Sequence, residues 1–122
     1  PFFEKDSLTD KPARFFVTEI IREKILQIYD KEIPYAVEVA VEQFKEDEGH
    51  IHIMAIIYVE RDSQKGIVIG KGGSALKKGG TLARKDIEAF FEKKVYLELY
   101  VKVEKDWRNK ENKLKSFGYQ LD

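Results

Sequence analysis

Residues 67–76 read IVIGKGGSAL, and they place a glycine corner, residues 70–73, between two apolar runs. Gly70 and Gly72 have no side chain, so another backbone can approach this corner closely. The run that follows the corner is helix-like, and the first amides of a helix lack partners and favour an anion. The stretch therefore predicts a phosphate-binding corner, filled either by a nucleotide or by a nucleic-acid strand.

The charges favour a polyanion at this corner. The chain has 22 basic and 22 acidic residues, yet residues 1–60 carry seven basic against thirteen acidic ones, and residues 86–122 carry eight of each. Between them, Asp62 is the one acidic residue of the stretch 61–85. The basic residues of that stretch are Arg61, Lys65, Lys71, Lys77, Lys78, Arg84 and Lys85. Positive charge is thus concentrated around the glycine corner, as a polyanion-binding surface requires.

Length and composition indicate one compact domain, because 122 residues of which 43% are hydrophobic suffice for a single core. No apolar run approaches the roughly 20 residues that span a bilayer, and no charged-then-apolar leader precedes the first element. Cysteine is absent, which excludes disulfides and thiolate metal sites and fits a reducing cytoplasm. The chain begins at Pro1 and not at Met, so we expect a piece of a longer protein.

Hydrophobic spacing predicts the elements. Residues 13–29 read as an amphipathic helix that Thr9 or Asp10 caps, and Pro34 predicts an extended residue before it. Residues 64–69 fit a strand or a helix equally. The other expected elements are strands at 35–44, 51–60 and 95–103, a turn at 45–49, a helix at 73–92, and a short helix from 106–108 to about 117–118. This order implies a three-stranded sheet backed by helices.

The glycines Gly79 and Gly80 lie inside the helix expected at 73–92, on its apolar stripe. Each costs about 1 kcal/mol relative to alanine in a helix interior. We therefore expect either a kink at this point or a domain of reduced stability.

Two alternative sites are weaker matches. Gly70, Gly72 and Ala75 satisfy G-x-G-x-x-G/A, which would bind a dinucleotide if 66–69 were a strand, with Glu88 or Glu92 as the acidic partner. Residues 66–71 resemble a phosphate loop but are one residue short, and Gly72 stands where Ser or Thr should hold magnesium. No catalytic Ser/His/Asp or Cys/His set can be assembled from two histidines and no cysteine.

A metal site at His50, His52 and Glu48 would lack further ligands in register, so we expect no metal. The sheet tyrosines support another possibility: a protein-interaction domain whose basic corner contacts an acidic partner while Tyr96 and Tyr100 dock a neighbour. Tyr35 and Tyr58 are likewise expected on strands, and all four fit packing on a sheet face better than base stacking.

A G-x-x-G corner that clamps a nucleic-acid backbone beside an apolar wall is the KH mode of single-strand recognition. Residues 67–76 resemble its central motif, and the order of elements is similar to the type II arrangement. We therefore expect an α+β fold, α-β-β-α-α-β, with a three-stranded mixed sheet packed against helices and a short C-terminal helix. Residues 1–10 would be a linker remnant, and residues 11–122 the KH domain with its C-terminal extension.

Four segments in order, 8–12, 19–24, 59–72 and 95–103 with 106–108, resemble the C-terminal domain of bacterial Era-type GTPases. The resemblance implies a cytoplasmic ribosome-assembly factor, with a peripheral place at the inner membrane for the parent protein. It also implies an N-terminal GTPase domain, absent here, as a partner of this domain, which itself is not an enzyme and needs no cofactor. Its other implied partners are the small ribosomal subunit and the 3′ end of the small-subunit (16S) ribosomal RNA. At Gly79 the chain departs from the family pattern, which has an aliphatic residue there, usually Ile.

The resemblance assigns backbone clamping to residues 70–73 and the apolar side of a base groove to residues 67–69. The charge pattern adds the lysines as phosphate contacts, and we expect apolar side chains of the second strand to complete the floor. The predicted RNA-binding residues are Lys65, Ile67, Val68, Ile69, Gly70, Lys71, Gly72, Gly73, Lys77 and Lys78.

Overall fold

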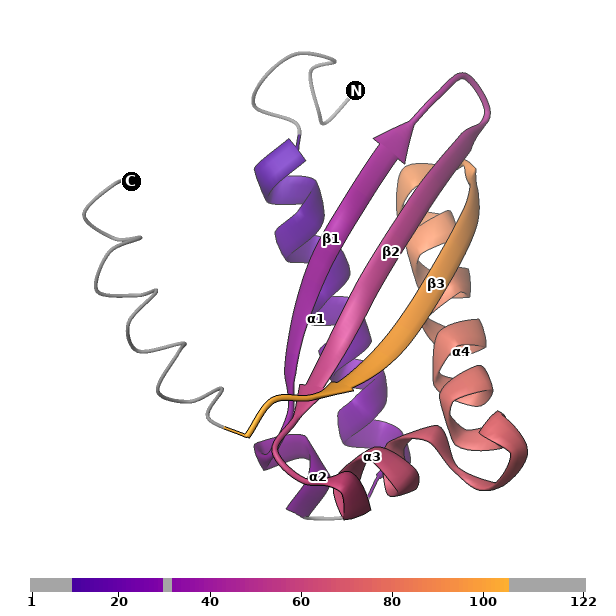
Figure 1. Ribbon diagram of the computed structural model, residues 1–122. Helices are drawn as coiled ribbons and strands as arrows, with labels where there is room; N and C mark the ends of the chain where they lie inside the picture. The colour runs from indigo at the N-terminus through magenta and orange to yellow at the C-terminus, as the bar shows by residue number, and fades with distance from the viewer. Residues whose placement is uncertain (1–9, 30–31, 106–122) are drawn as a thin grey trace, which may run out of the picture.

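A computed structural model describes residues 10–29 and 32–105. Of the predicted linker at 1–10, residues 1–9 lie outside the described residues, as does the predicted helix beyond residue 105, whereas Asp10 is already the first residue of a helix. The sheet has three strands, and Figure 1 shows the two long helices on one face of it and the short helices near one end. The elements are α1 (Asp10–Ile28), α2 (Glu32–Tyr35), β1 (Glu38–Glu46), β2 (His50–Val59), α3 (Asp62–Ile69), a 3-10 turn (Lys71–Gly73), α4 (Ser74–Phe91) and β3 (Lys94–Val103).

The sheet is mixed, in the order β1-β2-β3. A hairpin joins β1 to β2 as antiparallel neighbours, whereas β2 and β3 are parallel. Parallel neighbours need a crossover connection, and here it consists of α3, the glycine corner and α4. The predicted α+β, type II arrangement is confirmed, and β3 becomes an edge strand beside the crossover.

The core lies between the sheet and the two long helices, which contact each other (Figure 1). The central strand supplies its middle, because each side chain on its inner face is at most 2% exposed. Full burial of one such aliphatic side chain contributes about 1.5–3 kcal/mol. The inner face of β2 is formed by Ile51, Ile53, Ala55, Ile57 and Val59, and the helices add Val17, Ile21, Ile25, Ala83 and Ile87.

A β-bulge changes which face of β1 packs on the core. Val41 pairs with Ala55, but the next paired residue, Gln43, is opposite Met54, so the pairing register shifts by one residue. A shift of one residue moves a side chain to the other face. Phe44 consequently lies opposite Ile53 and packs against the core, which the even spacing of β1 did not predict.

The prediction of an extended residue before Pro34 was wrong, and so was the strand position of Tyr35. Both lie in the one-turn helix α2, and β1 begins only at Glu38. Proline is tolerated in a first helical turn because its missing N–H would have no partner there. Ile33 is buried in the core, and its carbonyl accepts a hydrogen bond from the N–H of Ala36, which offsets the unfavourable helical conformation before a proline.

Two glycines inside α4 do not interrupt it, since the helix runs continuously from Ser74 to Phe91. They face different neighbours: a β-carbon on Gly79 would lie 3.4 Å from Ile28 Cδ1, and one on Gly80 would lie 3.4 Å from Leu99 Cδ1. The pair therefore does not break the helix.

Lys24 joins the two long helices. This largely buried lysine of α1 lies 2.6 Å from Asp86 Oδ2 of α4 and 3.2 Å from Glu23 Oε1. The hydrogen bond to Asp86 is the main cause that raises the pKa of Lys24 above 10.5, against the opposing effect of its burial. The pair fixes α4, and with it the helix start at the glycine corner, against α1.

Candidate nucleic-acid interface

Three glycines of the corner have backbone angles that other residues rarely adopt. Gly70, Gly72 and Gly73 have φ values of +77°, +62° and +79°. Gly72 and Gly73 are left-handed, whereas Gly70, with a ψ of 171°, is extended at positive φ, and glycine adopts both conformations without a steric penalty. At Gly70 space adds a second constraint, because a β-carbon would lie 2.7 Å from Ala75 Cβ and 2.8 Å from its nitrogen. The sequence of the corner thus determines a tight reversal in which the start of α4 packs on Gly70.

Some backbone amides at the corner and at the start of α4 have hydrogen-bond partners, and others do not. Those of Gly70, Gly73 and Ser74 donate to carbonyls within the corner region. No side chain caps the start of α4. The next N–H groups of the helix have no partner inside it, so the positive end of α4 is open to an anion.

Tyr29 holds the entrance to the corner. Its hydroxyl, at the end of α1, donates a hydrogen bond to the carbonyl oxygen of Val68 in the last turn of α3. Carbonyls at a helix end have no intrahelical donor and need an outside partner. The bond therefore fixes the final turn of α3 just before Gly70, and burial raises the pKa of the Tyr29 hydroxyl.

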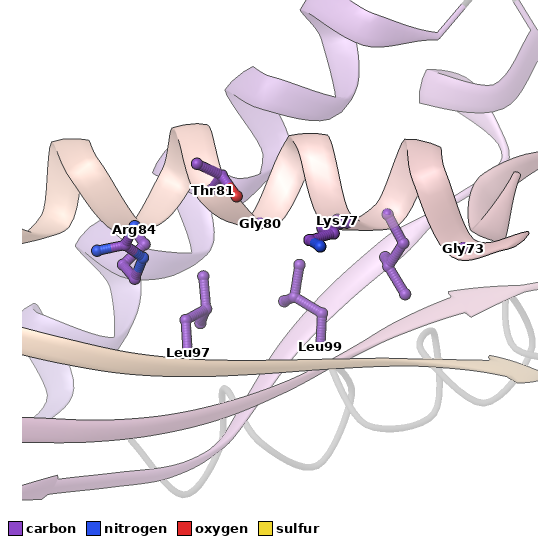
Figure 2. Close-up of a pocket in the computed structure, with 8 residues that line it drawn as sticks. Gly73, Lys77, Gly80, Thr81, Arg84, Leu97 and Leu99 are labelled. Atoms are coloured by element: carbon purple, nitrogen blue, oxygen red, sulfur yellow. The ribbon is translucent and has the colours of Figure 1, made fainter.

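A groove of about 310 Å³ begins at the corner and runs between α4 and β3. Figure 2 shows Leu97 and Leu99 of β3 rising toward α4, with Lys77 and Arg84 extending from the helix beside them. Gly80 leaves space above the strand, because a side chain there would contact Leu99. The groove has an apolar floor and basic walls, and its lining residues are Gly73, Leu76, Lys77, Gly80, Thr81, Arg84, Leu97 and Leu99.

The predicted apolar residues of the site separate into two roles. Ile67 is 54% exposed, and Ile69 is partly buried against the core. Val68 is fully buried, so its side chain supports the corner from inside and is not available to a ligand.

Of the predicted basic residues, Lys77 lines the groove, whereas Lys71 lies in the corner, Lys65 on α3 and Lys78 on α4. Lys71, Lys77 and Lys78 are exposed, and Lys65 is partly exposed on α3. Within the described part of the chain, none of these four lysines is paired with a carboxylate. No described carboxylate therefore neutralises the positive charge that these four lysines place around the glycine corner.

The floor of the groove differs from the prediction. We expected apolar side chains of the second strand, but the structure supplies Leu97 and Leu99 of β3. The reason is topology: β2 is central and its inner face is covered, whereas β3 lies at the edge beside α4. The sequence reasoning also missed Thr81 and Arg84 as groove residues. Their spacing from Lys77 along α4, at i+4 and i+7, is the signal that places all three on one helix face.

Glu88 lies one turn beyond Arg84 on α4 and does not itself line the groove. Its Oε2 accepts the N–H of Val95 at 2.9 Å, and its Oε1 accepts Nη1 of Arg84 at 3.1 Å. One carboxylate therefore connects the edge strand to the basic wall.

The structure disagrees with the dinucleotide interpretation, because that motif requires a strand before its first glycine and residues 62–69 form helix α3. Among residues 10–29 and 32–105, no three His, Cys, Asp or Glu side chains gather where they could hold a metal ion. His52 and His50 instead stack on Tyr96, with ring centroids 4.9 and 5.6 Å apart. In the same residues no helix has the length and apolarity needed to cross a bilayer.

A mixed three-stranded sheet whose parallel crossover contains a G-x-x-G corner beside an apolar groove defines a KH domain of type II. The sequence profile of the family described as KH domain matches residues 32–108. This chain belongs to the KH domain family.

Two solved structures are similar over nearly the whole chain. An Era variant from Aquifex aeolicus bound to GDP·AlF4− is 38% identical with a TM-score of 0.79, and the match covers 98% of this chain. The structure of Era in complex with MgGDPNP and nucleotides 1506–1542 of 16S ribosomal RNA is also 38% identical, with a TM-score of 0.80 and 98% coverage. The chain spans 40% of the length of each of these proteins. The resemblance to the Era-type KH domain is thereby confirmed.

Proposed function

We propose that this chain binds single-stranded RNA, and that it is the non-catalytic RNA-binding part of a longer, Era-like GTPase. The observation that carries the proposal is the groove itself, in which an apolar floor ends at a corner of three glycines with positive φ, and the nearby lysines have no carboxylate partner among the described residues. The similar Era structure that contains 16S ribosomal RNA nucleotides supports the same ligand class. We extend this to the 3′ end of small-subunit ribosomal RNA as the target, and to the small subunit and the GTPase domain as partners.

In this mechanism the strand backbone lies against Gly72 and Gly73, where no side chain keeps it away. Its phosphates meet the open start of α4 and the charges of Lys71 and Lys77. The bases lie on Leu97 and Leu99, whose apolar surface accepts their faces. An extended duplex cannot unstack its bases onto this floor, so the groove selects single strands.

The outer edge of β3 supplies the groups that read base edges. Among the described residues the strand pairs with β2 alone, so its other side carries N–H and C=O groups that no described strand meets. The N–H of Val95 shows this direction, because it donates to Glu88 of α4 and not to β2. Backbone orientation alternates with a period of two residues along a strand. The N–H and C=O groups of Leu97 and Leu99, two and four residues after Val95, therefore also point away from β2, and both residues line the groove.

The test is fluorescence-anisotropy binding of the chain to a single-stranded RNA that copies the 3′ end of small-subunit ribosomal RNA, at several salt concentrations, with the matching duplex as control. We expect binding that prefers the single strand and weakens with salt, with a slope of log K against log salt of roughly −0.7 for each phosphate contacted. Absence of binding by chains that circular dichroism shows to be folded would overturn the proposal. Such a result would favour the alternative, a protein-interaction domain. Tyr96 and Tyr100, half exposed on the open face of the sheet, would then contact the protein partner.

The variant Lys71→Asp with Gly72→Asp tests the corner. Lys71 is exposed, and a β-carbon at Gly72 has open space around it, so the fold should persist at the cost of about 1 kcal/mol for the left-handed Asp. RNA binding should be abolished. The matched control is Lys45→Asp with Gly49→Asp, the same change of charge at the β1–β2 hairpin, where Gly49 also has open space. Equal loss in both variants would mean that only net charge matters.

A further inference from the structure

Arg84 lies at the end of the groove opposite the glycine corner. Gly73 and Arg84 both line the groove, and between them α4 rises by about 15 Å at 1.5 Å per residue. Arg84 also lines a second hollow with Glu88, Glu92, Lys93 and Lys94, so it stands between the groove and that hollow. Figure 2 shows its side chain on the side of α4 that faces Leu97.

Glu88 holds this arginine in place. It accepts Nη1 of Arg84 with one oxygen and the N–H of Val95 with the other. Because the second bond is to backbone at the start of β3, the carboxylate cannot follow the arginine if that side chain swings away. The carboxylate therefore orients the guanidinium on the side of α4 where the groove lies.

Glu88 and Arg84 form an ion pair that is neutral as a whole, whereas the lysines of the corner have no carboxylate partner among the described residues. A compensated cation contributes little to the attraction of phosphates, whereas the guanidinium has five N–H donors in a fixed plane and only one is used by Glu88. Directional hydrogen bonding remains when net charge is gone. This combination suits a base edge better than a phosphate.

Resting on the proposed RNA binding, we infer that Arg84 is a specificity-determining residue that reads one base at the far end of the groove, with Glu88 as its positioning residue. The ligand is a base with two adjacent acceptors, for which the O6 and N7 of guanine are the best match. Thr81, one turn earlier on the same face, borders the same nucleotide. The corner then supplies affinity for any strand, and Arg84 selects the sequence at one position.

The experiment measures anisotropy for the same single-stranded RNA and for a set of RNAs that each replace one nucleotide by the other three bases. The wild-type chain should bind, and one position should prefer guanine by about tenfold. Arg84→Gln should remove that preference alone, lowering affinity for the preferred RNA about tenfold while leaving the salt slope unchanged. Glu88→Gln, which keeps an acceptor for Val95 but not the charge, should weaken the preference and steepen the salt slope, because Arg84 regains its charge.

Lys85→Gln is the matched control, since it removes a positive charge from the adjacent, exposed residue of α4 that does not line the groove. It should change affinity little and equally for all RNAs, and thermal unfolding should show that every variant is folded. If Arg84→Gln lowers affinity for all RNAs by one factor and makes the salt slope shallower, Arg84 contacts phosphate and the inference is wrong, although RNA binding stands. If Arg84→Gln changes neither affinity nor base preference, the inference is also wrong, and RNA binding again stands. Failure of the wild-type chain to bind any RNA would overturn both proposals.

Discussion

The hydroxyl of Tyr29 donates a hydrogen bond to the carbonyl of Val68, 39 residues further along the chain, and so ties the end of α1 to the turn that precedes the glycine corner. The corner itself is built from small residues and has few side-chain contacts of its own. Its position therefore depends on partners such as Tyr29 that lie outside any recognisable motif.

Removing this bond should loosen the corner without unfolding the domain. Tyr29→Phe keeps the ring and leaves the Val68 carbonyl without its donor, so the free energy of unfolding should fall by about 1 kcal/mol. Urea denaturation measures the loss, and the amide resonances of Gly70 and Gly72 should shift. Unchanged stability with unchanged resonances would show that the bond has no such role.

The same tyrosine gives the stability a dependence on alkaline pH. Burial raises the pKa of the Tyr29 hydroxyl above 10.0, so the unfolded chain loses this proton at a lower pH than the folded chain does. Above about pH 10 the unfolded state binds fewer protons, and stability falls as pH rises. Denaturation between pH 8 and 11 should show a smaller fall in Tyr29→Phe than in Tyr96→Phe, a control on the exposed face. Equal falls in the two variants would count against this cause.

The two glycines of α4 offer a matched pair of substitutions. Gly79→Ala and Gly80→Ala should each stabilise the helix by about 1 kcal/mol, because the added β-carbons meet the ends of mobile side chains at an ordinary contact distance of 3.4 Å. Only Gly80 lines the groove, so only Gly80→Ala should narrow it and weaken RNA binding. Thermal unfolding and anisotropy together test this. Equal RNA affinity in both variants would show that RNA does not occupy the part of the groove beside Gly80.

The ion pair between the long helices should be asymmetric in its response to mutation. Asp86→Ala leaves the largely buried Lys24 with Glu23 alone and should destabilise the domain by about 1–3 kcal/mol, a range reduced because the Asp86 side chain is 46% exposed. Lys24→Met, which removes the charge and keeps the apolar stem, should cost under about 1 kcal/mol. The double variant should resemble Lys24→Met when unfolding is followed in urea. If instead Lys24→Met costs as much as Asp86→Ala, the attraction itself dominates.

Much of the fold was predictable because its signals are local. The spacing of Val17, Ile21 and Ile25 predicts α1, and the alternation of Ile51, Ile53 and Ile57 predicts β2. The short segments were not predictable, since residues 64–69 satisfy two periodicities and only their packing between the sheet and α4 selects a helix. The bulge after Val41 was not predictable either, because no residue pattern in the strand indicates that one residue is left out of the pairing.

The candidate site divides in the same way. The glycines and lysines of the corner are adjacent in sequence, so composition and spacing locate them. Leu97 and Leu99 meet Lys77 and Arg84 only because β3 pairs with β2 in parallel and turns its inner face toward α4. This contact between β3 and α4 depends on the topology of the sheet, so the residue pattern within a single helix or strand does not predict it.

The parallel pairing of β2 with β3 has a consequence for how the domain is made. The glycine corner lies inside the connection between these strands, so its flanks are held on one side by a strand already formed and on the other by the last described strand of the chain. During synthesis the groove has no floor until β3 has emerged, and a product cut short before Lys94 lacks Leu97 and Leu99 altogether. Formation of the groove is thereby coupled to completion of the sheet, and an incomplete chain cannot present the surface on which a nucleic acid would lie.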